Sequence, residues 1–125
     1  MKLTRGGFVV AATLSLGGAS SAQQALSKSM IECSVIYTEV AALGQRKGRD
    51  EDEISRTRKR ALAFLNAALQ QAEDEGEADL QNYITETHAE LTDKWTDRLS
   101  SIVKLRDNKD WLDYCRSFAR ARGLW

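Results

Sequence analysis

Residues 80–103 read LQNYITETHAELTDKWTDRLSSIV, the stretch with the longest regular spacing of apolar side chains in the chain. Most successive members of this row lie three or four positions apart, which is the spacing of one face of an α-helix. The row consists of Leu80, Ile84, Thr87, Leu91, Trp95, Leu99, Ile102 and Val103. The spacing predicts a long helix over residues 77–105 that buries this face against other helices.

The chain before this stretch predicts two further amphipathic helices. Residues 24–43 have an apolar row from Leu26 to Leu43, and Gly44 is placed to end that helix before a loop over residues 44–49. Asp50 is a capping residue for a second helix over residues 51–74, which Gly76 ends. The inward face of this second helix is expected to comprise Ile54, Ala61, Leu62, Leu65, Ala68, Leu69 and Ala72, with Phe64 beside it.

A last helix is predicted between Asp107, as its cap, and Gly123. Its inward residues are expected to be Trp111, Leu112, Cys115, Phe118 and Ala119. No segment alternates apolar and polar residues as a strand does. We therefore predict an all-α fold, a small antiparallel bundle of three to four helices. It has either four up-and-down helices or three long helices with a short fourth packed across them.

Residues 1–22 have the organisation of a cleaved signal peptide. Lys2 and Arg5 precede an apolar run over residues 6–19, and small residues over 20–22 suit a signal peptidase. The run is shorter than the roughly 20 residues that a membrane-spanning helix needs. We expect export across the inner membrane, with the periplasm of a Gram-negative bacterium as the best-fitting compartment. Residues 23–125 then form one soluble domain without a membrane anchor.

The mature chain has no charge excess of the kind that nucleic-acid-binding proteins carry. The whole sequence has 18 basic and 18 acidic residues. Removing Lys2 and Arg5 leaves 16 basic residues against 18 acidic residues. Export also separates the chain from nucleic acids, so no nucleic-acid partner is expected.

The only two cysteines, Cys33 and Cys115, lie on inward faces of the first and last predicted helices. Because an exported protein matures in an oxidising compartment, we predict a disulfide between them. They form no C-x-x-C pair, so a redox role or covalent haem attachment is not expected.

Three further groups could form a functional site, and each has a simpler structural explanation. His88, the only histidine, could carry a proton or bind a metal with Glu86 or Glu90, or it could pack at the edge of the core. Neither a metal nor another cofactor is expected, because too few ligands of the usual types remain. An acidic stripe could bind a basic partner or a divalent cation, or could be a solvated face; it comprises Glu86, Glu90, Asp93 and Asp97.

The densest basic cluster contains Arg56, Arg58, Lys59 and Arg60. It could bind an anionic envelope polymer, lipid head groups or an acidic protein, or it could be a solvated helix face with an Asp52–Arg56 salt bridge. Trp125 at the C-terminus could cover the end of the bundle or anchor a partner.

The sequence shows no catalytic motif, which favours a small non-catalytic binding or accessory protein that docks another envelope protein. Two alternatives stay open at this stage. One is a carrier that encloses a small ligand among aromatic core residues. The other is a small enzyme that acts on an envelope polymer through a carboxylate with a raised pKa.

Overall fold

The structure is a computed structural model that describes residues 24–125, so the predicted signal peptide lies outside the described residues. Within this range the regular structure is entirely helical, which confirms the all-α prediction. The helices are α3 (Leu26–Arg46), α4 (Glu51–Asp74), α5 (Leu80–Arg98), α6 (Ile102–Asp107) and α7 (Lys109–Ala121). No helix in the described part has an apolar stretch long enough to cross a membrane.

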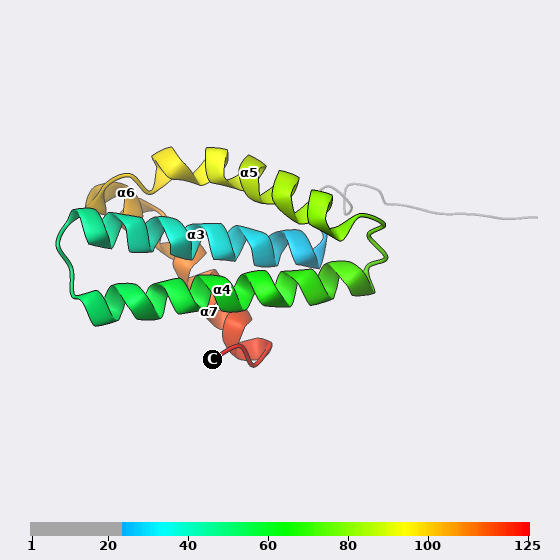
Figure 1. Ribbon diagram of the computed structural model, residues 1–125. Coiled ribbons are helices and arrows are strands. Elements are labelled where there is room, and N and C mark those ends of the chain that lie inside the picture. The colour runs from blue at the N-terminus through cyan, green and yellow to red at the C-terminus, as the bar shows by residue number, and fades with distance from the viewer. Residues whose placement is uncertain (1–23) are drawn as a thin grey trace, which may run out of the picture.

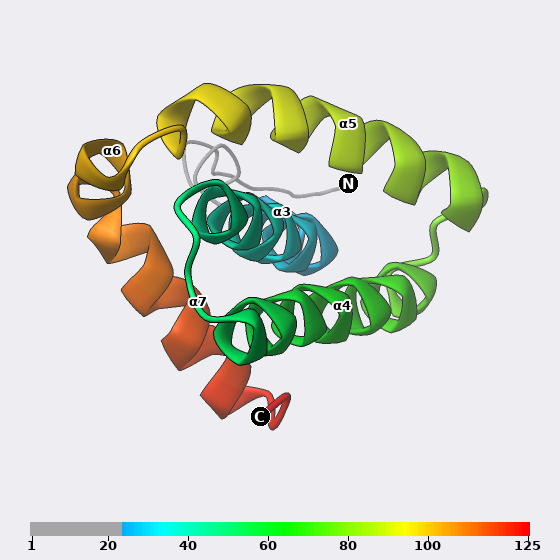
Figure 2. The ribbon, with the colours of Figure 1, turned by 60° about the vertical axis from the view of Figure 1, so that its left-hand side comes forward.

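Helix α3 lies at the centre of the molecule. Figure 1 shows it between α4 and α5, and Figure 2 shows the same order with α7 crossing α3 on a further side. Every residue from Met30 to Tyr37 is buried, whereas an amphipathic helix would bury only one face. The single inward face predicted for this helix is therefore too narrow, because α4, α5 and α7 cover it from several directions.

Helix α4 has the predicted bounds and the predicted cap. The Asp50 carboxylate accepts a hydrogen bond from the backbone N–H of Glu53 at 3.1 Å. Three acidic residues follow in the first turn, where they face the positive end of the helix dipole. The start of this helix is thus specified locally, by side chains that satisfy its free amides.

The inward face of α4 differs from the prediction. Leu62 and Leu69 were expected in the core but are 58% and 40% exposed, while Phe64 is fully buried. The buried face is built from small side chains that let α4 approach α3 closely; these are Ala61, Ala68 and Ala72. The Ser34 hydroxyl donates to the carbonyl oxygen of Ala61 at 2.7 Å, which shows how close the two helices lie. This approach turns the leucines outward.

Glycines end three of the helices, although not all at the predicted position. Gly76 and Gly123 have φ angles of 82° and 69°, as expected for residues that follow a helix end. Gly44 instead lies inside α3, so its predicted role is wrong. Gly48 takes the left-handed conformation, with φ 67°. The Arg49 N–H then donates to the Gly44 carbonyl at 2.9 Å, which closes the last turn.

The predicted helix over residues 77–105 is two helices in the structure. Helix α5 ends at Arg98, and α6 starts after Ser101, whose hydroxyl accepts from the N–H of Lys104 at 3.2 Å. Serine side chains compete for backbone hydrogen bonds, so the Ser100–Ser101 pair favours a new helix start over a continuous helix. The apolar row continues through the break, which is why spacing alone missed it.

The last helix also begins differently from the prediction. Asp107 is the final residue of α6, and α7 starts at Lys109, so the predicted Asp107 cap is wrong. The Asn108 side chain donates to the carbonyl oxygens of Arg98 at 3.2 Å and Lys104 at 2.9 Å. Because it binds carbonyl groups at the ends of α5 and α6, Asn108 fixes the corner from which α7 turns back under α3.

Candidate functional site

The predicted disulfide is present. Cys33 in α3 and Cys115 in α7 are bonded, with their Cα atoms 5.6 Å apart, and both residues are fully buried. The bond joins positions 82 residues apart in the sequence. It holds the C-terminal helix against the central one and so fixes where the α7 side chains meet α4.

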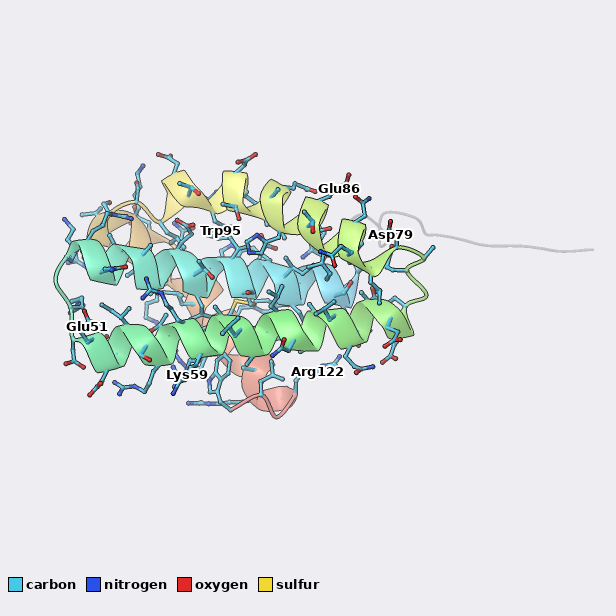
Figure 3. The ribbon with its side chains drawn as sticks, in the orientation of Figure 1. Glu51, Lys59, Asp79, Glu86, Trp95 and Arg122 are labelled. Carbon is cyan, nitrogen blue, oxygen red and sulfur yellow. A yellow bond between two sulfur atoms is a disulfide. The ribbon has the colours of Figure 1, made fainter. Side chains whose placement is uncertain are left out.

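That junction brings two groups of basic residues together into one surface, which we call the basic face. The Arg60 guanidinium of α4 lies 5.1 Å from the ring centre of Trp125, and the Arg122 guanidinium lies 5.9 Å from that of Phe118. Figure 3 shows Lys59 and Arg122 along the same edge of the molecule. The basic face comprises Arg56, Lys59 and Arg60 from α4, and Arg116, Arg120 and Arg122 from α7 and its end.

Most of these cations form no salt bridge within the described residues. In residues 24–125 only Arg116 of the basic face forms a salt bridge, with Asp113 at 3.0 Å. The Asp52–Arg56 bridge expected from the sequence does not form. Arg56, Lys59, Arg120 and Arg122 are exposed. Their positive charge is therefore available to an anionic group from outside the described chain.

Aromatic rings underlie the basic face. The Trp125 ring packs edge-on against Phe64 at 5.2 Å and against Tyr37 at 5.6 Å between ring centres. Of the two predicted alternatives for Trp125, the structure shows the ring folded back over the core, with part of it exposed. Arginine beside a partly exposed tryptophan is a combination that recurs at the energetic centres of protein interfaces.

The Tyr37 hydroxyl lies under this layer and has no hydrogen-bond partner among the described residues. Burial raises its pKa, and the positive charges of Arg116 and Arg60 oppose that rise without cancelling it. The hydroxyl is therefore neutral at pH 7 and feels the field of both arginines.

The acidic stripe predicted on α5 is exposed along its length; it comprises Glu86, Glu90, Asp93 and Asp97. Figure 3 shows Glu86 on the opposite edge of the molecule from Lys59. Glu90 forms a salt bridge with Lys28 at 3.1 Å, and Asp97 forms one with Lys104 at 3.2 Å. The stripe is thus partly neutralised within the chain, unlike the basic face.

The sequence prediction missed a buried carboxylate on α3. Glu32 is only 1% exposed. Its carboxylate accepts from Lys94 Nζ at 2.6 Å, Trp95 Nε1 at 2.7 Å and Gln24 Nε2 at 3.2 Å. Lys94 lies four residues after Glu90 on α5, and its side chain pairs with this carboxylate of α3. The available signal was a glutamate between Ile31 and Cys33, on the side of the helix that the apolar spacing places inward.

The pKa of Glu32 lies below its ordinary value of 4.5. Burial acts to raise it, but the hydrogen bonds from Lys94, Trp95 and Gln24 and the charge of Lys94 together outweigh burial. The group is therefore ionised at neutral pH, with its oxygens already bonded. A general acid needs the opposite shift, so this pair stabilises the contact between α3 and α5 and does not suit proton transfer.

A second polar cluster lies at the first turn of α3. The Glu75 carboxylate accepts from the Ser27 N–H at 3.0 Å and from the Ser27 hydroxyl at 2.6 Å, and the Tyr83 hydroxyl lies 2.7 Å from the same serine oxygen. Desolvation raises the pKa of Glu75, but its hydrogen bonds with Ser27 and Gln71 more than offset this and lower it. These contacts hold the start of α3 to the end of α4 and to α5.

His88 lies half-buried on α5, on the side that faces α4. Its Nδ1 atom is 3.4 Å from the Thr92 hydroxyl. Within the described range, no three His, Cys, Asp or Glu side chains come together as a metal-binding group. The structure therefore does not bring His88 together with Glu86 or Glu90 in such a group.

Comparison with known proteins adds no functional information. No protein-family model matches the sequence, and neither the curated proteins nor the solved structures contain a significant match.

Proposed function

We propose that this chain is an exported, non-catalytic binding protein that docks an acidic envelope protein through its basic face. The observation that carries this proposal is the meeting of cations from α4 and from the end of α7 over one layer of aromatic rings, with Arg60 over Trp125 and Arg122 over Phe118. These cations are distant in the sequence and are held together by the disulfide between α3 and α7.

Export rests on the pattern of residues 1–22 together with the disulfide. A disulfide is stable in an oxidising compartment and rare in a reducing cytoplasm. Purification from the native cell, followed by intact-mass measurement, tests this step. We expect a mature antiparallel bundle domain that begins at Gln23 and contains one disulfide. A cytoplasmic protein that keeps residues 1–22 would contradict it.

A binding role fits the described ionisable groups better than catalysis does. The carboxylates with shifted pKa values, those of Glu32, Glu75 and Asp113, are all shifted downward and hydrogen-bonded within the chain. Aromatic core residues that could enclose a ligand pack against one another, as Trp95 does with Trp111 at 5.3 Å between ring centres. Five of the six cations of the basic face form no salt bridge within the described residues, so their charge is open to a partner.

A protein partner fits this face because charge and apolar area occur together. Exposed arginines steer an acidic partner and set its orientation, whereas a partly buried tryptophan supplies area that excludes water. The acidic surface of such a partner would contact Arg56 and Arg120, and an apolar side chain would cover the exposed part of Trp125.

The test compares two double variants with the same change in net charge. Arg56→Glu with Arg120→Glu reverses two exposed cations of the basic face. Arg106→Glu with Lys47→Glu reverses two exposed cations in α6 and in the loop between α3 and α4. All four side chains lack a salt bridge in the described part, so both variants should keep the fold.

Each protein is produced with its signal peptide in the native organism and is then captured from the envelope. The envelope proteins that stay bound to it are quantified. We expect one predominant acidic protein, with retention lowered at least about tenfold by the basic-face variant and unchanged by the matched control. Retention of no protein, or equal loss with both variants, would contradict docking at the basic face.

A further inference from the structure

The opposite flank of α4 carries an apolar row that the fold covers only in part, with its middle residue half-buried. We call this row the leucine stripe; it consists of Leu62, Leu65 and Leu69, with Arg58 at one end and Glu73 at the other. The spacings along it are four, three, four and four residues, which place all five side chains on one face of the helix. Leu62 is 58% exposed and Leu69 is 40% exposed.

The stripe borders a groove of about 340 Å³ between α4 and α5. Leu62 and Leu65 form its α4 side, Thr38 of α3 contributes to its floor, and His88 lies on the α5 side. The basic face lies on the other flank of α4, where Arg60 meets Trp125. The groove and the basic face are therefore separate surfaces of the same helix.

The stripe is symmetrical about its middle, between Leu65 and Asn66. Leu62 and Leu69 lie equally far from this point on either side. Farther out, Arg58 and Glu73 are again equally distant from it, and they carry opposite charges. A two-fold axis at this point would place each residue of one helix at the height of its counterpart in an antiparallel copy.

We infer that the leucine stripe is the interface of a homodimer in which α4 packs antiparallel against α4 of a second copy. Leu62 of each copy then lies across from Leu69 of the other. Arg58 of each copy lies across from Glu73 of the other, so both ends of the interface pair opposite charges. A two-fold interface requires a self-complementary surface of this kind, and exposed apolar rows commonly mark interaction sites.

The end groups are free to make these pairs. Arg58 donates to Gln45 Oε1 at 2.7 Å, which uses one of its nitrogens, and Glu73 accepts only a long bond of 3.4 Å from Gln70 within the same helix. Neither has a salt bridge within residues 24–125. The second copy would also cover the groove beside His88 and shield the leucines from water.

Sedimentation velocity of the purified, disulfide-bonded protein over a concentration series tests the dimer. We expect a reversible monomer–dimer equilibrium. Leu62→Glu should give a folded monomer, because Leu62 is mostly exposed, and its thermal midpoint should no longer depend on protein concentration as that of the wild type does. Arg58→Glu and Glu73→Arg should each raise the dimer dissociation constant at least about tenfold.

The charge-swapped protein with Arg58→Glu and Glu73→Arg together is the decisive variant. In an antiparallel homodimer it recreates both pairs with reversed polarity, so its dissociation constant should return to within about threefold of the wild-type value. If a different protein occupied the groove, this swap would not restore its binding. A wild-type protein that is monomeric at all concentrations would overturn the inference, and so would a charge-swapped protein that dimerises no more tightly than its single variants. The basic-face variant, Arg56→Glu with Arg120→Glu, is the control and should leave the dimer intact.

Discussion

Replacing Lys94 by methionine tests the buried ion pair between α3 and α5. Lys94 Nζ lies 2.6 Å from a carboxylate oxygen of Glu32, and Glu32 is almost completely buried. Methionine keeps most of the apolar stem of lysine but removes its charge. The variant therefore leaves an ionised carboxylate in the core without its cation.

The expected loss of unfolding free energy at pH 7 is about 3 kcal/mol, at the lower end of the range for removing one partner of a buried ion pair. Two features keep the expected loss of unfolding free energy small. Trp95 and Gln24 still donate to Glu32, and the Lys94 side chain is itself 39% exposed, so water can approach the site. Lys109→Met is the control, because its exposed pair with Asp113 should contribute nothing measurable to stability.

The pH dependence has a defined sign. In the wild type the pKa of Glu32 is lower when folded than its ordinary value of 4.5. Its contribution is therefore present above about pH 4.5 and is lost as the pH falls through the lower folded value. In Lys94→Met the burial that raises this pKa remains while the lysine is gone, so Glu32 takes up a proton more readily.

Both effects reduce the difference between the two proteins in acid. Urea unfolding at pH 7 and at pH 4 should show a stability difference between Lys94→Met and the wild type that is larger at pH 7 than at pH 4. The reasoning is refuted if Lys94→Met costs no more than Lys109→Met at pH 7. It is also refuted if the stability difference is the same at both pH values.

Three further predictions concern stability and are measured by the same urea unfolding. Replacing Cys33 and Cys115 by alanine together should lower the unfolding free energy by about 4–5 kcal/mol, from the loop entropy of a crosslink spanning 82 residues; a loss below 1 kcal/mol would contradict this. Tyr37→Phe should be neutral or stabilise by up to about 1 kcal/mol, because the buried hydroxyl lacks a partner, and a clear loss would reveal an unseen hydrogen bond. Gly76→Ala should cost about 1 kcal/mol because φ is 82°, whereas Gly44→Ala inside α3 should stabilise by about 0.5–1 kcal/mol, and equal effects would contradict the assigned helix ends.

Features that depend on neighbouring residues were predictable from the sequence. Asp50 caps α4 through an amide three residues away, and Gly76 follows the last turn of that helix. The disulfide was also predictable, because only two cysteines occur and both fall on inward positions. By contrast, the apolar row that crosses Ser100 and Ser101 looks continuous, and only the Ser101 cap divides it into two helices.

Features that depend on how helices pack were not predictable. A spacing pattern indicates one inward face, so it could not show that α3 is enclosed on several sides or that Glu32 is buried and bonded to Lys94. It also could not show that the small alanines of α4 would pack inward and leave Leu62 exposed. Only the α4 part of the basic face was predictable from the sequence. The α7 arginines come close to α4 because the Cys33–Cys115 bond holds α7 against α3 and because Trp125 folds back over the core.

A contact map by site-specific photo-crosslinking tests the central claim most directly. A crosslinking amino acid is placed at Lys59 or Arg120 on the basic face, at Asp93 on the acidic stripe and at Arg106 in α6, away from both. All four side chains are exposed, so each replacement should preserve the fold. In the native cell envelope, docking at the basic face predicts adducts with one acidic protein from Lys59 and Arg120 only. Adducts mainly from Asp93, or none from the basic face, would contradict it.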